Sequence, residues 1–401
     1  MKKKVTIVGG GACALMLACE LNTAKFDVSI YEKNGALGRK FLVAGEGGLN
    51  LTHSENQKNF ITRYTPASFF ENSFLHFSNK DFILWLNELG ITTFVGSSGR
   101  VFPSRGIKPI EVLNTFLNKI KKNKVEIFTK HTLKKFSHEN ILYFESGSVL
   151  KEIKSDIIIF CLGGASWPVT GSDGIWTALI KEKGIQINPF KASNCSFKIN
   201  WPDAIVSKIE GKVLKNISIT CGGKIHLGEI VLTKTGIEGS GIYPLSPEIR
   251  IQLEEKKIAE IVLDFKPNLS LEKIQEKLNS KPSETNITEH LKKHLNLSNI
   301  HVQLLKSYLS KEDFLNNIIL SKKVKEFKLL ITETGPIEDA ISTIGGIDLK
   351  EIDSNFQLKK LPECYAIGEM LDYDAPTGGY LLQSCFSMAK FLSDRLNSVT
   401  F

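Results

Sequence analysis

The sequence lacks the features that define several classes of protein. Its seven cysteines are scattered, show no CxxC spacing and have no cluster of histidines near them. This pattern argues against a structural zinc site and against a disulfide framework, and it favours the reducing cytosol. We therefore expect a cytoplasmic protein that binds no metal and whose cysteines are mostly small buried packing residues.

Long hydrophobic runs are also missing, apart from one at the N-terminus. Residues 1–19, MKKKVTIVGGGACALMLAC, resemble a secretory signal, even a lipoprotein signal with its cut before Cys19. Three consecutive glycines directly after a five-residue strand do not suit a signal, so we interpret this segment as folded structure. No other apolar run approaches the roughly 20 residues that span a bilayer, and we expect no membrane partner.

A dense block of Lys and Arg with interleaved aromatics is absent too. The formal charge of +8 gives a modest positive field that attracts anionic small molecules, nucleic acid or anionic lipid without choosing among them. The lysines of residues 246–330 are nearly balanced by acidic residues, which favours a solvated helical surface. A nucleic-acid partner is therefore disfavoured, and RNA association stays open only as an alternative. No pattern specifies an oligomeric state.

The N-terminal pattern is that of a βαβ unit. Residues 4–8 predict a buried strand, 9–11 a glycine turn, 12–22 a helix and 26–32 a second strand. Helical and strand patterns follow, which we list in chain order: helices at 67–89 and 108–122, a strand meander within 125–154, an apolar strand at 156–164 and a helix at 173–183.

With 401 residues the chain exceeds what one hydrophobic core usually organises. Alternating, glycine-punctuated segments after residue 190 predict a second, β-rich domain, and a lysine-rich stretch with Ser and Thr caps predicts helices. We expect an α/β fold with three parts: a Rossmann-like dinucleotide domain of three layers (ββα) from 1–190 and 340–401, an inserted β-rich domain from 191–247 and 328–339, and a small helical subdomain from 248–327.

The first motif is Gly9-Gly10-Gly11-Ala12-Cys13-Ala14, which fits GxGxxA between a strand and a helix. Gly9 would form the tight turn, Gly11 would let pyrophosphate approach the helix N-terminus, and Ala14 would allow close helix packing. Glu32 ends the second strand, where a carboxylate accepts hydrogen bonds from ribose hydroxyls. An acid at this place disfavours the 2′-phosphate of NADP, and FAD and NAD both stay open.

Two further glycine-rich segments favour FAD over NAD. Residues 38–50 combine cations that could meet phosphate with glycines that could pass a flat ring, and residues 367–381 lead into a C-terminal helix. A dinucleotide as long as FAD needs such a second contact region, and a helix beginning near residue 379 would favour an anionic reduced flavin. An NAD dehydrogenase without flavin is the less favoured alternative.

Five segments spread over the whole chain, in the expected order, resemble the BaiN/YhiN-type family of FAD-dependent oxidoreductases: GRKFLVAGEGGLNLTHSE, LGGASWPVTGSDG, GEIVLTKTGIEGSGIYPLS, ISTIGGIDL and AIGEMLDYDAPTGGYLLQ. The resemblance implies a glutathione-reductase-like flavoprotein with a two-part FAD domain and an inserted domain. Where many members read SGGGRCN, this chain has AGEGGLN, which indicates a separate subgroup and weakens any transfer of substrate.

The FAD contacts that the motifs and the resemblance imply lie in four places along the chain. We list these four in order: Gly9, Gly11, Ala12 and Ala14 in the first turn; Glu32 and Lys33 after the second strand; Arg39, Lys40, Gly45, Gly47, Gly48 and Asn50 around pyrophosphate and flavin; Gly368, Glu369, Asp372, Gly378, Gly379, Tyr380 and Leu381 at the ribityl and ring end. A fifth contact, with adenine, is expected near Leu133.

Catalytic residues are only weakly indicated, with His53, Glu46, Tyr380 and Thr343 as candidates beside the flavin motifs. A capping role for His53 and a loop-stabilising role for Glu46 are the favoured interpretations. No His or Cys is placed for covalent attachment, so we predict noncovalent FAD. A second GxGxxG is missing, so NAD(P)H would bind transiently at most. We predict an FAD-dependent oxidoreductase that reduces an activated double bond, or oxidises an amine, of a small organic molecule. An RNA-associated flavoprotein stays open as the alternative.

Overall fold

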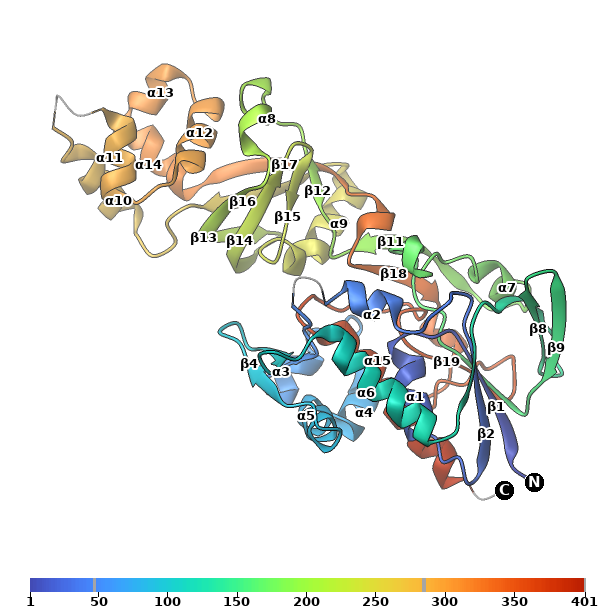
Figure 1. The fold of residues 1–401 in the computed structure, drawn as a ribbon. Helices are drawn as coiled ribbons and strands as arrows, with labels where there is room; N and C mark the ends of the chain where they lie inside the picture. The colour runs from blue at the N-terminus through green and yellow to red at the C-terminus, as the bar shows by residue number, and fades with distance from the viewer. Residues whose placement is uncertain (46–47, 283–285, 400–401) are drawn as a thin grey trace. The chain divides into compact units, whose positions relative to one another are not determined.

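The computed structural model describes residues 1–45, 48–282 and 286–399, and it divides into two compact units (Figure 1). Unit 1 comprises Met1–Lys191 and Ile341–Phe401, and unit 2 comprises Ala192–Ala340. Unit 1 is therefore built from both ends of the chain. The predicted glutamate and glycine at residues 46 and 47 lie outside the described residues.

Unit 1 is organised by a five-stranded parallel sheet with the order β19-β10-β1-β2-β6. Its strands are β1 (Lys3–Val8), β2 (Phe26–Tyr31), β6 (Glu126–Phe128), β10 (Ile157–Phe160) and β19 (Cys364–Ala366). Every residue of β10 is fully buried, as expected for a parallel strand covered on both faces. Because β19 comes from the C-terminal part of the chain, the sheet joins residues more than 350 apart in sequence.

Helices and a second sheet cover the two faces of this parallel sheet. Helix α1 (Ala12–Glu20) packs against α15 (Tyr380–Ser398) and α6 (Pro109–Lys122). An antiparallel meander, β7 (Thr132–Phe136), β8 (Ile141–Ser146) and β9 (Val149–Lys154), packs on the sheet through the pairs Phe136–Phe160 and Tyr31–Phe144, whose ring centroids lie 5.1 and 4.3 Å apart. The predicted three-layer Rossmann-like fold is confirmed.

The remaining elements of unit 1 are short. In chain order they are α2 (Arg39–Val43), β3 (Thr52–His53), α3 (Gln57–Ile61), α4 (Ala67–His76), α5 (Asn79–Glu88), β4 (Thr93–Val95), β5 (Arg100–Pro103), the 3-10 turn η1 (Pro168–Thr170), α7 (Thr177–Lys181), β11 (Ile187–Ser193), β18 (Ser342–Ile347) and η4 (Leu349–Glu351). Strands β3, β5 and β4 form a small sheet with β5 in the middle, and β11 pairs with β18.

The helix predicted over residues 67–89 is two helices. Helix α4 ends at His76, and α5 begins again at Asn79. Ser78 and Asp81 form a capping box, in which the Ser78 hydroxyl accepts from the Asp81 N–H and the Asp81 carboxylate accepts from the Ser78 N–H. This capping box marks the start of a new helix, so the prediction of one continuous helix over residues 67–89 was wrong.

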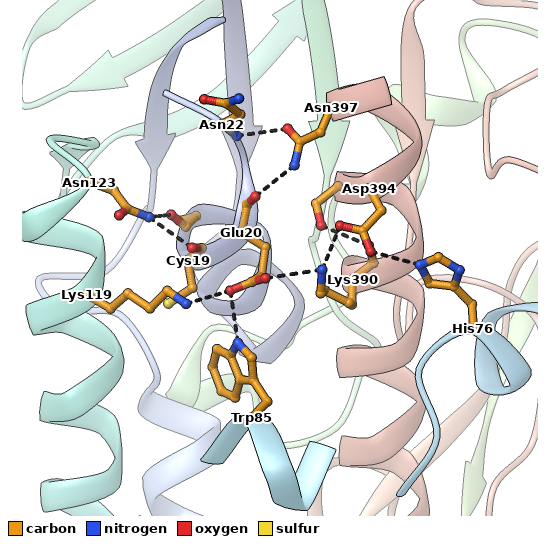
Figure 2. A network of polar contacts seen from close by, with 12 residues as sticks. Cys19, Glu20, Asn22, His76, Trp85, Lys119, Asn123, Lys390, Asp394 and Asn397 are labelled. Carbon is orange, nitrogen blue, oxygen red and sulfur yellow. Dashed lines mark hydrogen bonds and ion pairs between the residues drawn. The ribbon is translucent and has the colours of Figure 1, made fainter. Parts of the chain in front are cut away.

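A network of charges at the end of α1 holds the helical layer together (Figure 2). The carboxylate of Glu20 accepts from the Trp85 indole N–H at 2.9 Å and from Lys119 at 2.7 Å, and it also pairs with Lys390 at 3.3 Å. A carboxylate at a helix C-terminus is unfavourable in itself, and the two lysines compensate for it. The network thereby joins α1 to α5, α6 and α15.

Unit 2 contains a closed barrel with the strand order β12-β15-β14-β13-β16-β17. Its elements are β12 (Phe197–Ile199), α8 (Asp203–Ile209), β13 (Lys212–Cys221), β14 (Lys224–Thr233), β15 (Gly236–Glu238), η2 (Tyr243–Leu245), α9 (Ser246–Lys256), β16 (Ala259–Asp264), α10 (Leu271–Asn279), α11 (Ile287–His294), α12 (Asn299–Tyr308), α13 (Lys311–Leu315), α14 (Asn317–Lys325), β17 (Phe327–Thr334) and η3 (Ile337–Asp339). Buried aliphatic residues of the barrel and of the helices share one core.

The expectation that residues 248–327 are wholly helical was wrong, because β16 lies within them. Ala259, Ile261 and Leu263 are fully buried, whereas Glu260 between them is exposed. This period of two is that of a half-buried strand, and β16 completes the barrel between β13 and β17. In the described part of the chain, no helix is long and apolar enough to cross a membrane.

Candidate functional site

The three glycines after β1 have three different surroundings. A Cβ on Gly9, whose φ is +103°, would collide with the carbonyl oxygen of Cys161, and a Cβ on Gly10 would lie 2.7 Å from a methyl group of Leu37. A Cβ on Gly11 would meet nothing within 4 Å. Gly11 is also the N-cap of α1, whose first turn has no acidic residue and no side-chain cap. The helix N-terminus therefore faces open space, which suits an anion.

The residues that follow Gly11 support this turn by packing. Ala14 is fully buried, and Ala12 is partly buried against the core of unit 1. Seven of the nine residues of α1 are buried, so small side chains let the helix lie close to the sheet.

Glu32 is fixed by two neighbouring segments. Its Oε2 atom accepts from the Gly10 N–H at 2.7 Å, and its Oε1 atom accepts from the Asn34 N–H at 2.7 Å. Its side chain is only 8% exposed. Oε1 also accepts from the Asn34 side-chain amide at 2.9 Å, and each carboxylate oxygen has two lone pairs, so the acceptor capacity that remains for a ribose hydroxyl is on Oε2.

The loop after β10 also reaches the end of β2. Lys33 forms an ion pair with Asp173 at 2.7 Å, and the Asn34 side chain donates to the Thr170 carbonyl at 3.2 Å. The ammonium group of Lys33 is therefore neutralised by a carboxylate of the chain. Arg39 is exposed and donates to the Asn34 side-chain oxygen at 2.8 Å.

The segment before Leu133 runs beside Glu32. The His131 N–H donates to the Glu32 carbonyl, and the Lys130 N–H donates to the Asn34 carbonyl, both at 2.9 Å. Leu133 follows directly as the second residue of β7 and is partly buried. The structure thus brings the backbone near Leu133 toward the end of β2 that carries Glu32.

Lys40 and Glu369 form an ion pair at the centre of a larger network. The Lys40 Nζ atom lies 2.9 Å from Glu369 Oε2 and 2.8 Å from the hydroxyl of Ser166. Glu369 also accepts from the N–H of Thr343 at 3.1 Å. Four segments far apart in sequence meet here: α2, the loop after β10, β18 and the loop after β19. Lys40 is thus committed to a carboxylate of the chain.

Thr343 is a structural residue of this network. Its hydroxyl accepts from the N–H of Ala165 at 3.3 Å, and a Cβ on Gly164 would collide with it. Only 4% of Thr343 is exposed. This packing leaves its hydroxyl supporting the glycine turn after β10.

The glycine-rich loop after α2 and the start of β3 each contain a buried polar atom without a partner among the described residues. Asn50 donates to the Gly48 carbonyl at 3.3 Å, while its Oδ1 atom and the Oγ1 atom of Thr52 make no hydrogen bond with the described residues. Unpartnered buried acceptors are costly, so a hydrogen-bond donor of a ligand would be favourable at these two atoms. Gly45 packs on Pro109, and Gly48, with φ at +108°, lies against Phe102.

The C-terminal motif is held by close backbone contacts. A Cβ on Gly368, whose φ is +85°, would lie 2.5 Å from the sulfur of Cys13. A Cβ on Gly379, whose φ is +96°, would lie 2.6 Å from the Cα of Thr52. The Asp372 carboxylate accepts from the Asn188 side chain at 2.6 Å and from the Gly345 N–H at 2.9 Å. These contacts require glycine and fix the turn before α15.

Tyr380 and His53 are both bound within the chain. The Tyr380 hydroxyl donates to Glu55, which pairs with Arg63 at 3.0 Å, and the His53 ring stacks on Tyr380 at 5.2 Å. His53 Nδ1 accepts from the Glu55 N–H at 3.2 Å, so its Nε2 donates to the Ser98 carbonyl at 3.0 Å.

Burial and the hydrogen bond to Glu55 raise the pKa of Tyr380 far above its ordinary value. Burial raises the pKa of Glu55, but hydrogen bonds from Arg63 and Tyr380 outweigh it and lower the pKa. The tyrosine is therefore a phenol and the glutamate a carboxylate at neutral pH. Leu381, next in α15, packs partly buried against the core.

Residues 3–393 match the family described as HI0933-like protein Rossmann domain. The chain belongs to this family. The resemblance to BaiN/YhiN-type flavoproteins is thereby confirmed, and the HI0933-like chain is an FAD-dependent oxidoreductase. This class disfavours the alternative of an NAD dehydrogenase without flavin.

Two relatives extend over nearly the whole HI0933-like chain. The "Ribosomal RNA dihydrouridine synthase" of Haemophilus influenzae is 24% identical over 405 residues, which covers 96% of each chain. The "3-dehydro-bile acid delta(4,6)-reductase" of Clostridium scindens is 24% identical over 400 residues, which covers 95% of each chain. The solved 3-ketosteroid delta1-dehydrogenase of Sterolibacterium denitrificans is similar in fold, with a TM-score of 0.53 at 11% identity over 98% of this chain and 99% of that one.

Three residues of this HI0933-like site were not among the site residues predicted from the sequence. Asn34, Asp173 and Ser166 hold the predicted contacts Glu32, Lys33 and Lys40 in place. Asp173 and Ser166 lie in the segment GGASWPVTGSDG, which we had quoted only for the resemblance. The glycine pair at 163–164, directly after a strand, suggests a close approach of the backbone to a ligand, but it does not select Ser166 or Asp173.

Proposed function

We propose that this HI0933-like oxidoreductase reduces a carbon–carbon double bond conjugated to a carbonyl group. The observation that carries the proposal is that the two relatives described above are named for one type of reduction. A dihydrouridine is a uridine whose ring double bond, conjugated to a carbonyl, has been saturated. A delta(4,6)-reductase acting on a 3-dehydro compound reduces double bonds conjugated to a ketone. The reduction of an activated double bond is thus favoured over the oxidation of an amine.

The described residues fit noncovalent FAD. The open space at Gly11 and the α1 N-terminus suits the pyrophosphate, and the spare acceptor capacity of Glu32 suits ribose. The unpartnered atoms of Asn50 and Thr52 would gain partners beside the flavin, near the N-terminus of α15. Both nitrogens of His53 are hydrogen-bonded, and all seven cysteines are buried, which disfavours a covalent link and suits a cytoplasmic protein.

Bound FAD would supply hydride transfer to the substrate carbon. The substrate gains a hydride at its β-carbon and a proton at its α-carbon, and these two electrons come from NAD(P)H, which becomes NAD(P)⁺. The sequence has one glycine-rich dinucleotide motif, so NAD(P)H would bind only transiently. The protonated Tyr380 and the carboxylate of Glu55 would hold α15 in position at the flavin.

A second candidate substrate is a uracil base within RNA. The name of the Haemophilus influenzae relative favours it, because that protein is 24% identical over 96% of the chain. The chemistry would be the same, since the ring double bond of uracil is conjugated to a carbonyl. RNA binding would weaken steeply with salt, whereas turnover of a small neutral enone would not.

Anaerobic spectroscopy of the purified protein tests both candidates. We expect a yellow protein with absorbance near about 450 nm that bleaches with NADH or NADPH and recovers on addition of an enone such as 2-cyclohexenone. If uridine-containing RNA restores the flavin absorbance and the enone does not, the second candidate, a uracil base within RNA, is the substrate. A colourless protein that takes up no FAD would refute the proposed function.

A further inference from the structure

Arg100 lies beside the candidate flavin site, although no motif selected it. It begins β5, the middle strand of the small sheet, and its partner in β3 is His53. The Arg100 side chain contacts the turn before α15, where a Cβ on Gly378 would lie 3.2 Å from its Nε atom. Phe102, two residues later on the same face of β5, lies 3.3 Å from the Cβ position of Gly48. One face of β5 thus contacts both glycine segments that we assign to the flavin.

The guanidinium of Arg100 is not committed to another group. By contrast, three other cations of unit 1, Lys33, Lys40 and Arg63, each form an ion pair with a carboxylate, at 2.7, 2.9 and 3.0 Å. Within residues 1–45, 48–282 and 286–399, the Arg100 side chain has no hydrogen bond and no ion pair. The residue is partly buried.

Two positive groups meet at this turn. The N-terminus of α15 carries a partial positive charge, and the Arg100 guanidinium adds a full one. Such groups repel each other unless an electron-rich group binds between them. The α15 N-cap, Gly379, has no side chain that could serve, and α15 has no acidic residue in its first turn. An arginine held in this way is typical of a site that binds an anionic or strongly polarised oxygen.

We propose that Arg100 donates hydrogen bonds to the carbonyl oxygen of the substrate. This inference rests on the proposed function. When hydride adds to the β-carbon of a conjugated carbonyl compound, the electron pair of the double bond moves toward the carbonyl, and negative charge builds on the oxygen. A proton on the α-carbon then restores the carbonyl. A fixed guanidinium stabilises the charged oxygen more strongly than the neutral one.

Phe102 makes the same face suitable for a planar carbon skeleton. Its ring stacks on Phe94 with centroids 5.5 Å apart and is partly buried. The Phe102 ring would contact the apolar carbon skeleton of an unsaturated carbonyl compound. The Arg100 guanidinium, two residues earlier on the same strand, would bind its oxygen.

A planar anion tests the proposal without turnover. The phenolate of 4-hydroxybenzaldehyde carries an oxygen like that of the charged intermediate, and its stacking on oxidised flavin would give a long-wavelength absorption band. We would titrate it into FAD-loaded wild type, Arg100→Gln, Arg100→Lys and the matched control Arg105→Gln. Arg105 is an exposed arginine just after β5. Flavin content and thermal unfolding report that each variant is folded.

We expect Arg100→Gln to weaken phenolate binding about tenfold or more, because it removes a charge-assisted hydrogen bond. Arg100→Lys keeps the charge without the planar fork and should bind with intermediate affinity. Arg105→Gln should stay within about twofold of wild type, because solvent and salt screen an exposed charge.

Two results would overturn the role of Arg100. They are no phenolate binding by wild type and unchanged phenolate binding by Arg100→Gln. If the unchanged binding is accompanied by a shifted flavin midpoint potential, the guanidinium interacts with the cofactor instead. A different result would contradict the proposed function alone. In that case the phenolate affinity still depends on Arg100, but no conjugated carbonyl compound reoxidises the reduced wild-type protein.

Discussion

The Nζ atom of Lys40 lies 2.9 Å from the carboxylate of Glu369, a residue 329 positions later in the chain. This ion pair joins α2 to the loop after β19, and Ser166 and Thr343 extend it to two more segments. Because Glu369 is 8% exposed, its charge depends on Lys40 for compensation. The pair thereby couples the two ends of the chain at the place where we propose that FAD binds.

Lys40→Met should leave the Glu369 carboxylate buried without its cation. We expect a loss of about 2 to 3 kcal/mol in the free energy of unfolding and weaker FAD binding, measured by thermal unfolding and by flavin titration. Lys134→Met is the matched control, because the Lys134–Glu145 pair is half-exposed on both sides. That change should cost less than about 1 kcal/mol. Equal losses in the two variants would contradict a special role for Lys40.

Gly9 and Gly11 should respond in opposite ways to alanine. Gly11→Ala places a methyl group in open space at an ordinary φ of −82°, so the apoprotein should keep its stability while FAD affinity falls about tenfold or more. Gly9→Ala forces a φ of +103° and a collision with Cys161, and it should destabilise the apoprotein by about 2 kcal/mol or more. Thermal unfolding without and with FAD separates the two effects. FAD binding by Gly11→Ala at wild-type strength would rule out this turn as the pyrophosphate site.

Tyr380→Phe should weaken the fold without changing the pH dependence of turnover. The change removes the hydrogen bond to Glu55, which costs about 1 kcal/mol. The pKa of Tyr380 is raised far above neutral, so the phenol stays protonated over the pH range of the assay. Its titration therefore causes no rise or fall in the rate as the pH changes. Rates of flavin reoxidation by an enone between about pH 6 and 9 would be compared for the two proteins. A limb that is present in wild type and absent in the variant would make Tyr380 a proton donor after all.

The sequence predicted those parts of the molecule whose signals are local. The strand, glycine turn and helix of residues 4–20 are contiguous, and Glu32 follows at the usual spacing, so the dinucleotide turn was visible. The partners of Lys33 and Lys40, which are Asp173 and Glu369, were not, because those contacts depend on how distant segments approach each other.

Two misassigned elements had local signals that other patterns obscured. The alternation of β16 spans only six residues inside a lysine-rich stretch that otherwise favours helix. The capping box of Ser78 and Asp81 was present in the sequence, but the apolar spacing on either side of it suggested one continuous helix. Arg100 had no local signal, because its importance depends on the absence of a partner for its charge.

His301 should make the stability of unit 2 depend on pH. Its Nδ1 atom accepts from the Ser298 N–H at 3.2 Å in a capping box, so Nε2 carries the proton, and that buried atom has no partner among the described residues. Burial, and then the charge of Lys266, lower the pKa of His301 from 6.5 to about 4. The folded state therefore favours the neutral ring. The resulting stability is fully present above pH 6.5 and is lost as pH falls from there toward 4.

His301→Gln isolates this effect, because glutamine can complete the same capping box without titrating. Over the full window from pH 6.5 to about 4, wild type should lose about 3 to 4 kcal/mol of stability relative to the variant, since one pKa unit corresponds to about 1.4 kcal/mol. Hydrogen exchange of the amides of α12 at pH 7 and pH 5 measures the difference within unit 2. We expect the protection of α12 in wild type to fall more steeply toward pH 5 than in the variant. Parallel pH profiles for the two proteins would show that His301 is protonated in the folded state at its ordinary pKa.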